Sequence, residues 1–331
     1  MTIDDGAAAG RPFAALLLAL LACCPALAFA GIEIEFASVG TARDVLGTRD
    51  AFVERLSPFD RAARMKAGDD VSEAEFLAFV RQAPRKWTPD ERRRLTTAFE
   101  GIEDELSALL PQLDRPVLLV KTGGAEEVGA GYTRGNAVVL PQRSLDRPRR
   151  ELQRLLAHEI FHVVSRNSPT LRRALYETIG FHHCGEVALP ATLARRRITN
   201  PDAPVDDHCI RLRVDGSEVW AVPVLLSRRP RYEPEAGHGL LDDMRLGMLL
   251  VNRPSSPSLP PRIVERGGAP VLVSVGDVEE LFEQIGRNTS YIIHPEEILA
   301  SNFELLVLGA QDVPTPDVLA RMRRVLAAAR R

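Results

Sequence analysis

The sequence lacks a strong excess of charge of either sign. Its 42 lysine and arginine residues are balanced by 45 aspartate and glutamate residues, which gives a formal net charge of -3 at pH 7. Because basic and acidic residues are interspersed, the chain offers no broad electropositive surface to a phosphate backbone. We therefore expect no nucleic acid among its partners.

A long apolar run is also absent after the first thirty residues, so we expect no transmembrane span in the mature chain. The early run, Phe13 to Leu27, follows Arg11 and precedes Ala28-Phe29-Ala30, which places small residues at the -3 and -1 positions of a cleavage site. This pattern predicts a signal peptide over residues 1–30 and a mature chain that begins at Gly31.

Two other interpretations of this N-terminal segment stay open. Leu20 to Cys23 resembles a bacterial lipoprotein box, in which Cys23 would carry a lipid anchor. A permanent membrane anchor is less favoured, because Pro25 interrupts a run that is already short. The alanine- and arginine-rich composition is typical of bacterial proteins. We therefore expect a periplasmic or secreted protein, or a lipoprotein if Cys23 is lipidated.

Cysteine is scarce: the chain has four, and only Cys184 and Cys209 follow the predicted signal peptide. An even pair in an oxidising compartment predicts a disulfide that closes the loop between them. The nearby His182, His183 and His208 allow a second metal site instead, although their spacing does not match that of a zinc knuckle. We expect the disulfide.

The chain has no internal repeat and no phosphate-binding loop, because the glycines between residues 122 and 135 are not followed by GKS or GKT. The capping sequence Thr88-Pro89-Asp90-Glu91 predicts a helix that ends near Leu110. Apolar runs at 116–121 and 137–140 predict two strands. Helices thus precede and follow a sparse set of strands, and this mixture is typical of an α+β fold.

We expect residues 31–331 to form a single domain. Its N-terminal part, about 40–112, is predicted to be helical, and two proline-initiated helices, about 295–308 and 316–329, are predicted to close the chain. The region of about 185–268 is rich in proline and arginine and is predicted to be an insertion of loops and strands. A lid over a cleft is one role that this irregular composition allows.

The stretch LLAHEIFHVV, residues 155–164, carries the strongest functional signal. His158 and His162 are four residues apart, so on a helix they lie one turn apart and can both direct a ring nitrogen to one metal ion. Glu159 lies about 100° round the helix from His158, where its carboxylate can reach a water bound to that ion. The competing interpretation is an ordinary core helix whose histidines hydrogen-bond one another or a buried acid.

A helix from Ser144 or Asp146 to about Arg166 would carry these residues. Catalytic zinc usually has three protein ligands and a water, so a third ligand is needed. The metzincin arrangement would place this ligand six residues after His162, where the chain has Ser168. That class is therefore excluded.

Far downstream, HPEEILASNFELLV (294–307) resembles the second motif of gluzincin metallopeptidases, in which a glutamate ligand is followed four residues later by an aspartate. The segment from Glu297 to Ser301 matches that register, except that Ser301 stands at the position of the aspartate. The resemblance implies that Glu297 binds one zinc ion together with the two histidines of HEIFH. Since the aspartate orients a metal-bound histidine in that family, Ser301 would be a weaker substitute unless Asn302 or a water contributes.

Two other glutamates remain alternatives for the third ligand. Glu296 adjoins Glu297, and both would fall in the first turn of a helix, where carboxylates are favoured in any case. Glu177 is closer to HEIFH in sequence but lacks the pattern that follows Glu297. His294 is a weak catalytic candidate that could stabilise an oxyanion, although a capping role is more common for a histidine at such a position.

The resemblance extends to a strand. Zincin peptidases have a sheet whose edge strand precedes the HExxH helix and pairs with an extended peptide, and Gly131 to Pro141 stands at that place. Tyr132, in this strand, and Tyr291 are further, weaker oxyanion candidates. The resemblance thus implies a zincin-like α+β fold with a small mixed sheet.

The resemblance also implies an exported zinc peptidase that acts on a peptide or protein substrate. Glu159 would take a proton from an activated water and pass it to the leaving amine. The alternative function is that of a non-catalytic envelope or binding protein, with the same scaffold and a structural metal or none.

Overall fold

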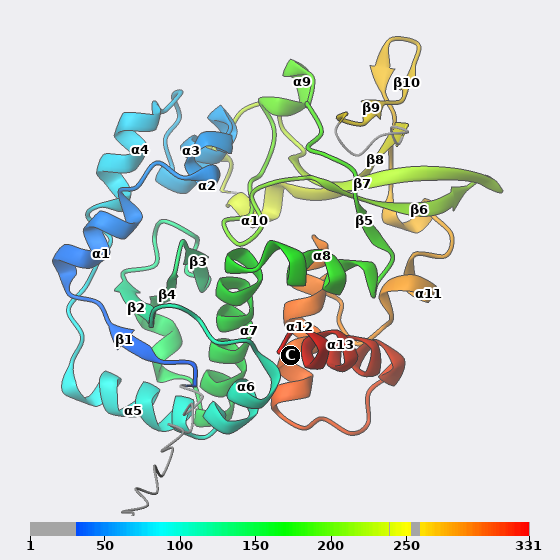
Figure 1. Cartoon of the computed structure of the whole chain (residues 1–331). Coiled ribbons are helices and arrows are strands. Elements are labelled where there is room, and N and C mark those ends of the chain that lie inside the picture. The colour runs from blue at the N-terminus through cyan, green and yellow to red at the C-terminus, as the bar shows by residue number, and fades with distance from the viewer. Residues whose placement is uncertain (1–30, 238, 253–258, 331) are drawn as a thin grey trace, which may run out of the picture. The chain divides into compact units, whose positions relative to one another are not determined.

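The chain folds into helices and two main sheets in a computed structural model that describes residues 31–237, 239–252 and 259–330 (Figure 1). The predicted signal peptide, with Cys23, lies outside the described residues. Residues Gly31–Arg331 form one unit by their internal contacts. Within the described ranges, no helix is both long and apolar enough to cross a membrane. The mixture of helices and sheets confirms the α+β class.

The N-terminal part is helical, and short polar side chains begin most of its helices. Ser57, Ser72 and Thr88 each form a capping box with the acidic residue three positions later. The helices are α1 (Val39–Leu46), α2 (Ala51–Arg55), α3 (Pro58–Met65), α4 (Glu73–Val80), α5 (Pro89–Glu100) and α6 (Glu103–Leu109).

The helix that was predicted to continue from Thr88 to Leu110 is instead divided into α5 and α6 at Gly101. A Cβ atom at Gly101 would lie only 2.5 Å from a guanidinium nitrogen of Arg149. Gly101 is therefore packed against the Arg149 side chain, at the start of the next long helix.

A small sheet carries the strands that precede the HEIFH helix. Its order is β1-β2-β4-β3, formed by β1 (Ile34–Phe36), β2 (Val117–Thr122), β4 (Ala137–Pro141) and β3 (Tyr132–Arg134). β1, β2 and β4 are parallel, whereas β3 pairs antiparallel with β4. The sheet is therefore mixed, and β3 is at its edge.

The HEIFH sequence lies in α7 (Arg149–Asn167), the longest helix among the described residues. It begins after a 3-10 turn at Gln142–Asp146, so Pro148 rather than Ser144 or Asp146 is its N-cap. α12 (Pro295–Val307) packs along α7, as Figure 1 shows. α8 (Pro169–Glu177) and α13 (Pro316–Ala329) complete this helical layer.

The middle region, about 185–268, contains loops and strands, and its longer strands pair in an antiparallel sheet. The order is β12-β8-β7-β6-β5, with β9 beside β8. The strands are β5 (Phe181–His183), β6 (His208–Val214), β7 (Ser217–Ser227), β8 (Met244–Asn252), β9 (Arg262–Ile263) and β12 (Leu272–Val273). The shorter elements are α9 (Ala191–Ala194), α10 (Leu240–Asp243), β10 (Glu265–Arg266), β11 (Ala269–Pro270) and α11 (Leu281–Ile285).

The predicted disulfide between Cys184 and Cys209 is not formed, which corrects the expectation drawn from their even number. His182 lies opposite Cys209 in the β5–β6 pair, and the N–H of Cys184 donates to the Asp207 carbonyl. The two cysteines are therefore diagonal neighbours. The Cα atoms of such neighbours lie roughly 7–8 Å apart, beyond the usual range of about 4.4–6.8 Å for a disulfide. Both thiols lie instead in a buried apolar cluster.

Candidate metal centre

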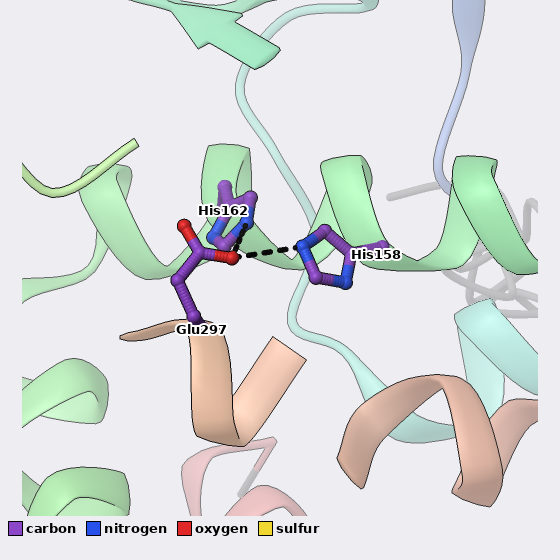
Figure 2. A group of neighbouring side chains, drawn as sticks. All are labelled: His158, His162 and Glu297. Atoms are coloured by element: carbon purple, nitrogen blue, oxygen red, sulfur yellow. Dashed lines mark hydrogen bonds and ion pairs between the residues drawn. The ribbon is translucent and has the colours of Figure 1, made fainter. Parts of the chain in front are cut away.

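Two helices that are far apart in sequence bring three potential ligands together. His158 and His162 extend from one face of α7, and Glu297 extends toward them from the first turn of α12 (Figure 2). Glu297 Oε2 lies 3.0 Å from His158 Nε2 and 3.5 Å from His162 Nε2. The apolar side of α7 is fully buried, which fixes the position of both rings.

These distances fit a zinc ion. Two ligands that each lie about 2.0–2.1 Å from zinc at a tetrahedral angle are roughly 3.3 Å from each other. His162 Nε2 is also a buried polar atom with no hydrogen-bond partner among the described residues. Such an atom is costly to leave unsatisfied, and coordination to a metal would satisfy it.

The second nitrogen of each ring is held by a carboxylate. His158 Nδ1 lies 2.6 Å from Glu304 Oε1, and His162 Nδ1 lies 3.0 Å from Glu296 Oε1. A carboxylate only accepts, so each Nδ1 donates and each Nε2 is left to face the centre. Carboxylate–histidine pairs of this kind orient metal ligands and increase their basicity.

The carboxylates also set the charge of the site. Burial alone would lower the pKa of His158, but hydrogen bonds with Glu297 and Glu304 outweigh it and raise this pKa to about 10. Burial would also lower the pKa of His162, but the negative charges around it, first that of Glu297, hold this pKa well above its usual value. The histidines in turn hold the pKa of Glu297 well below its usual value, although burial opposes this. The carboxylates thus give the site an excess of negative charge, which protons on the histidines or a bound cation can balance.

Glu159 lies beside this cluster and faces a cleft. Its side chain is buried, Oε2 has no hydrogen-bond partner among the described residues, and burial raises its pKa to about 8. The cleft has a volume of about 430 Å³, and His158, Glu159 and Glu297 line one part of it. Gly131 lies opposite, where a Cβ atom would come within 2.9 Å of Glu159 Oε1. Glycine therefore keeps the space in front of this carboxylate open.

The segment from Thr199 to Asp202, which belongs to the middle region, lies over the centre. Asn200 Nδ2 donates to Glu297 Oε1 at 2.6 Å. Asp202 Oδ1 accepts from the backbone N–H and the hydroxyl of Thr133 in β3, at 2.7 and 2.6 Å. The segment therefore contacts both a candidate ligand and the edge strand of the sheet.

The structure places the other candidate residues as follows. His294 is the N-cap of α12: its Nδ1 accepts from the Glu296 N–H, and burial lowers its pKa to about 4. Tyr291 lines the cleft, whereas Tyr132 is buried, with its hydroxyl 3.4 Å from Glu126. Glu177 is exposed at the end of α8 and belongs to neither of the ligand groups found among the described residues.

The histidine rings are oriented by glutamates and not by Ser301, which stands at the aspartate position of the gluzincin motif. Among the described residues, Glu296 and Glu304 hydrogen-bond the Nδ1 atoms, and Ser301 and Asn302 do not. Asn302 instead bonds Asn288 and the Ile298 carbonyl.

Sequence reasoning missed both the role of Glu304 and that of Asp202. Glu304 was detectable, because it lies seven residues after Glu297 and so on the same helical face. Asp202 is part of a loop without periodicity, and no pattern links it to the site.

Comparison with known proteins gives one finding. A family model described as the eCIS core domain matches residues 123–170. This stretch contains β3, β4 and α7 with both histidines and Glu159, and it ends well before α12. No curated protein and no solved structure matches the chain.

Proposed function

We propose that this protein is an exported zinc peptidase with His158, His162 and Glu297 as the metal ligands. The observation that carries the proposal is the fit of these three side chains to a tetrahedral ion, with a buried His162 Nε2 that nothing else satisfies. The gluzincin resemblance supports the same ligand set. The family match covers the helix with both histidines, but its description names no activity.

In this proposal Glu159 moves the proton. Its carboxylate adjoins the ligand cluster and faces the cleft, so it can accept a proton from a water and then donate it to the leaving amine. A bound zinc ion would supply Lewis acidity toward that water and the scissile carbonyl. Burial favours the protonated form of Glu159 after the first transfer, which suits the second transfer. Tyr291, at the rim of the cleft, is the candidate donor to a developing oxyanion.

The substrate class follows from the sheet. β3 is an edge strand beside α7, and a peptide can add to such an edge through backbone hydrogen bonds. The zincin-like arrangement of edge strand, HExxH helix and third-ligand helix supports a peptide or protein as the substrate. It does not favour one sequence of that peptide over another.

The test combines metal content with activity. We expect about one zinc per purified wild-type chain by elemental analysis, and a sharp loss of zinc in Glu297→Ala. Glu177→Ala is the matched control, because this exposed glutamate belongs to neither ligand group, and it should retain zinc. Glu159→Gln should retain zinc but lose hydrolysis of a peptide library. A wild-type chain that binds no zinc, even with excess metal, would refute the peptidase proposal.

One observation favours a different function. Structural zinc sites are closed by four protein ligands, and a carboxylate oxygen of Asp202 lies within 4.8 Å of ligand atoms of His162 and Glu159, beside the three candidate ligands. A non-catalytic envelope or binding protein with a structural metal would bind zinc, but it would show no hydrolysis that Glu159→Gln could abolish. The same pair of measurements therefore separates the two functions.

A further inference from the structure

Three polar side chains converge on the open side of the ligand cluster without bonding one another. A carboxylate oxygen of Asp202, one oxygen of Glu159 and a ring nitrogen of His162 all lie within 4.8 Å of one another. His162 and Glu159 are almost fully buried, and His162 Nε2 and Glu159 Oε2 have no hydrogen-bond partner among the described residues. Asp202 and Glu159 also line the same cleft as His158 and Glu297, so the Asp202 carboxylate lies on the side of the centre that is open to the cleft.

The position of Asp202 is built into the fold. At the start of the segment, Thr199 donates from its N–H (3.0 Å) and its hydroxyl (2.8 Å) to Asp60. At its end, Arg166 NH2 donates to the carbonyls of Pro201 and Asp202, each at 3.2 Å. Charged side chains from α3 and α7 therefore hold both ends of the segment.

The Asp202 carboxylate also accepts from a backbone N–H group on the edge strand β3. In β3, Thr133 pairs with Val138 of β4 in the register of the sheet, and its own backbone N–H donates to Asp202. A peptide that added to β3 would need this N–H, or one beside it, for its own backbone bonds. Asp202 thus acts at two places that a substrate must reach.

We propose that Asp202 is a fourth, displaceable ligand of the metal and that the Thr199–Asp202 segment holds the peptidase in a closed, latent state. The inference rests on the proposed function. In the closed state the Asp202 carboxylate takes the coordination position that a water needs. It also accepts from the Thr133 N–H, which a bound peptide would need for its own backbone bonds. Substrate binds only when the segment moves away from both.

The test uses the cobalt-loaded protein and acetohydroxamate, a small probe that binds metals at an open position. The variants are Asp202→Ala, which removes the ligand and the bond to Thr133, and Asp202→Asn, whose amide oxygen still accepts from Thr133 but is a poorer ligand. Asp206→Ala is the matched control, because Asp206 lies in the same loop but pairs with Arg197 at 2.8 Å instead. The visible absorption of cobalt reports both the coordination and the probe affinity.

We expect both Asp202 variants to change the cobalt spectrum and to bind acetohydroxamate at least about tenfold more tightly, because a closed state that dominates lowers the apparent affinity by the open fraction. Amide exchange at Thr133 should become at least roughly tenfold faster in Asp202→Ala only, since its bond is then lost. Asp206→Ala should match the wild type in all three measurements.

Equal probe affinity and equal spectra in the wild type and both Asp202 variants would overturn the role of Asp202 while leaving the metal centre intact. Failure of the wild type and every variant to bind cobalt would instead refute the proposed function, and this inference with it. Asp202→Asn guards against misfolding, because it preserves the size and the Thr133 contact of the native side chain.

Discussion

His158 is satisfied on both sides of its ring by carboxylates from one helix. Glu297 faces Nε2, and Glu304, two turns further along α12, faces Nδ1. Arg154 donates to the other oxygen of Glu304 at 3.0 Å, which fixes this carboxylate in turn. The ring is therefore oriented by a chain of side chains rather than by a single contact.

Replacing Glu304 by Gln tests that orientation. The amide keeps the size of the side chain but loses its charge, so His158 becomes a less basic ligand. We expect the zinc affinity to fall about 10- to 100-fold, as for other residues that hold metal ligands. Chelator competition measures this change. Ser301→Ala, in the same helix, is the control and should leave the affinity unchanged; a large loss there and none in Glu304→Gln would mean that the serine orients the ligands after all.

At the scale of elements, α7 and α12 are joined by pairs of opposite charge when no metal is bound. The pKa of His158 is about 10 in the folded protein, compared with about 6.5 in an unfolded chain. A folded-state pKa above the unfolded one gives stability that is present below about pH 6.5 and is lost as the pH rises toward 10. Zinc-bound histidine carries no such proton, so the bound form should not share this loss.

We therefore predict that the unfolding temperature of the metal-free protein falls between pH 6.5 and 9.5, while that of the zinc-bound protein falls less. In a chain of this size, 1 kcal/mol corresponds to roughly 2 °C. Thermal unfolding with and without a chelator checks the prediction, and His158→Gln should reduce the slope of the metal-free form. A stabilisation by zinc that does not grow with pH would contradict it.

The elements differ in how far the sequence predicted them. The capping sequence at Thr88 and the apolar periodicity around HEIFH predicted helices that exist, because local signals alone determine them. The break at Gly101 was missed, although a glycine inside a helical pattern is a common helix end. The middle region was predicted to contain loops and strands, but the pairing of its strands in one antiparallel sheet was not predicted, because strand pairing is non-local.

The site shows the same limit. The histidine pair and Glu297 come from short patterns, and the structure brings them together. Asp202 reaches Thr133 across 69 residues of sequence, and no spacing rule connects them. Contacts made by loops are therefore the part of the site that sequence reasoning could not supply.

At the scale of the molecule, Arg64 connects the N-terminal helices to the region around the metal centre. Its buried guanidinium bonds Asp60 and Glu127, each at 2.6 Å, and the Thr199 carbonyl at 3.0 Å. Burial alone would lower its pKa, but the charges of Glu127 and Asp60 outweigh this and raise it further above its usual value. The Arg64 guanidinium thus connects α3 to Glu127, which precedes β3, and to Thr199, at the start of the Thr199–Asp202 segment.

Arg64→Ala should leave the buried carboxylates of Asp60 and Glu127 without a cation, at a cost of roughly 3–5 kcal/mol in the free energy of unfolding. Denaturant unfolding measures this loss. Arg93→Ala removes an exposed arginine that pairs with Asp90 and should change the stability little. Comparable losses in the two variants would show that the buried network contributes no more than a surface pair.

The distance in sequence between the ligands also has a consequence in time. His158 and Glu297 are 139 residues apart, and Glu297 belongs to the second-last helix. While the ribosome is still making the middle of the chain, the histidines of α7 exist without their third ligand or the carboxylates that orient them. A nascent chain therefore cannot assemble the metal centre, and any reactivity of that centre begins only after synthesis is nearly complete.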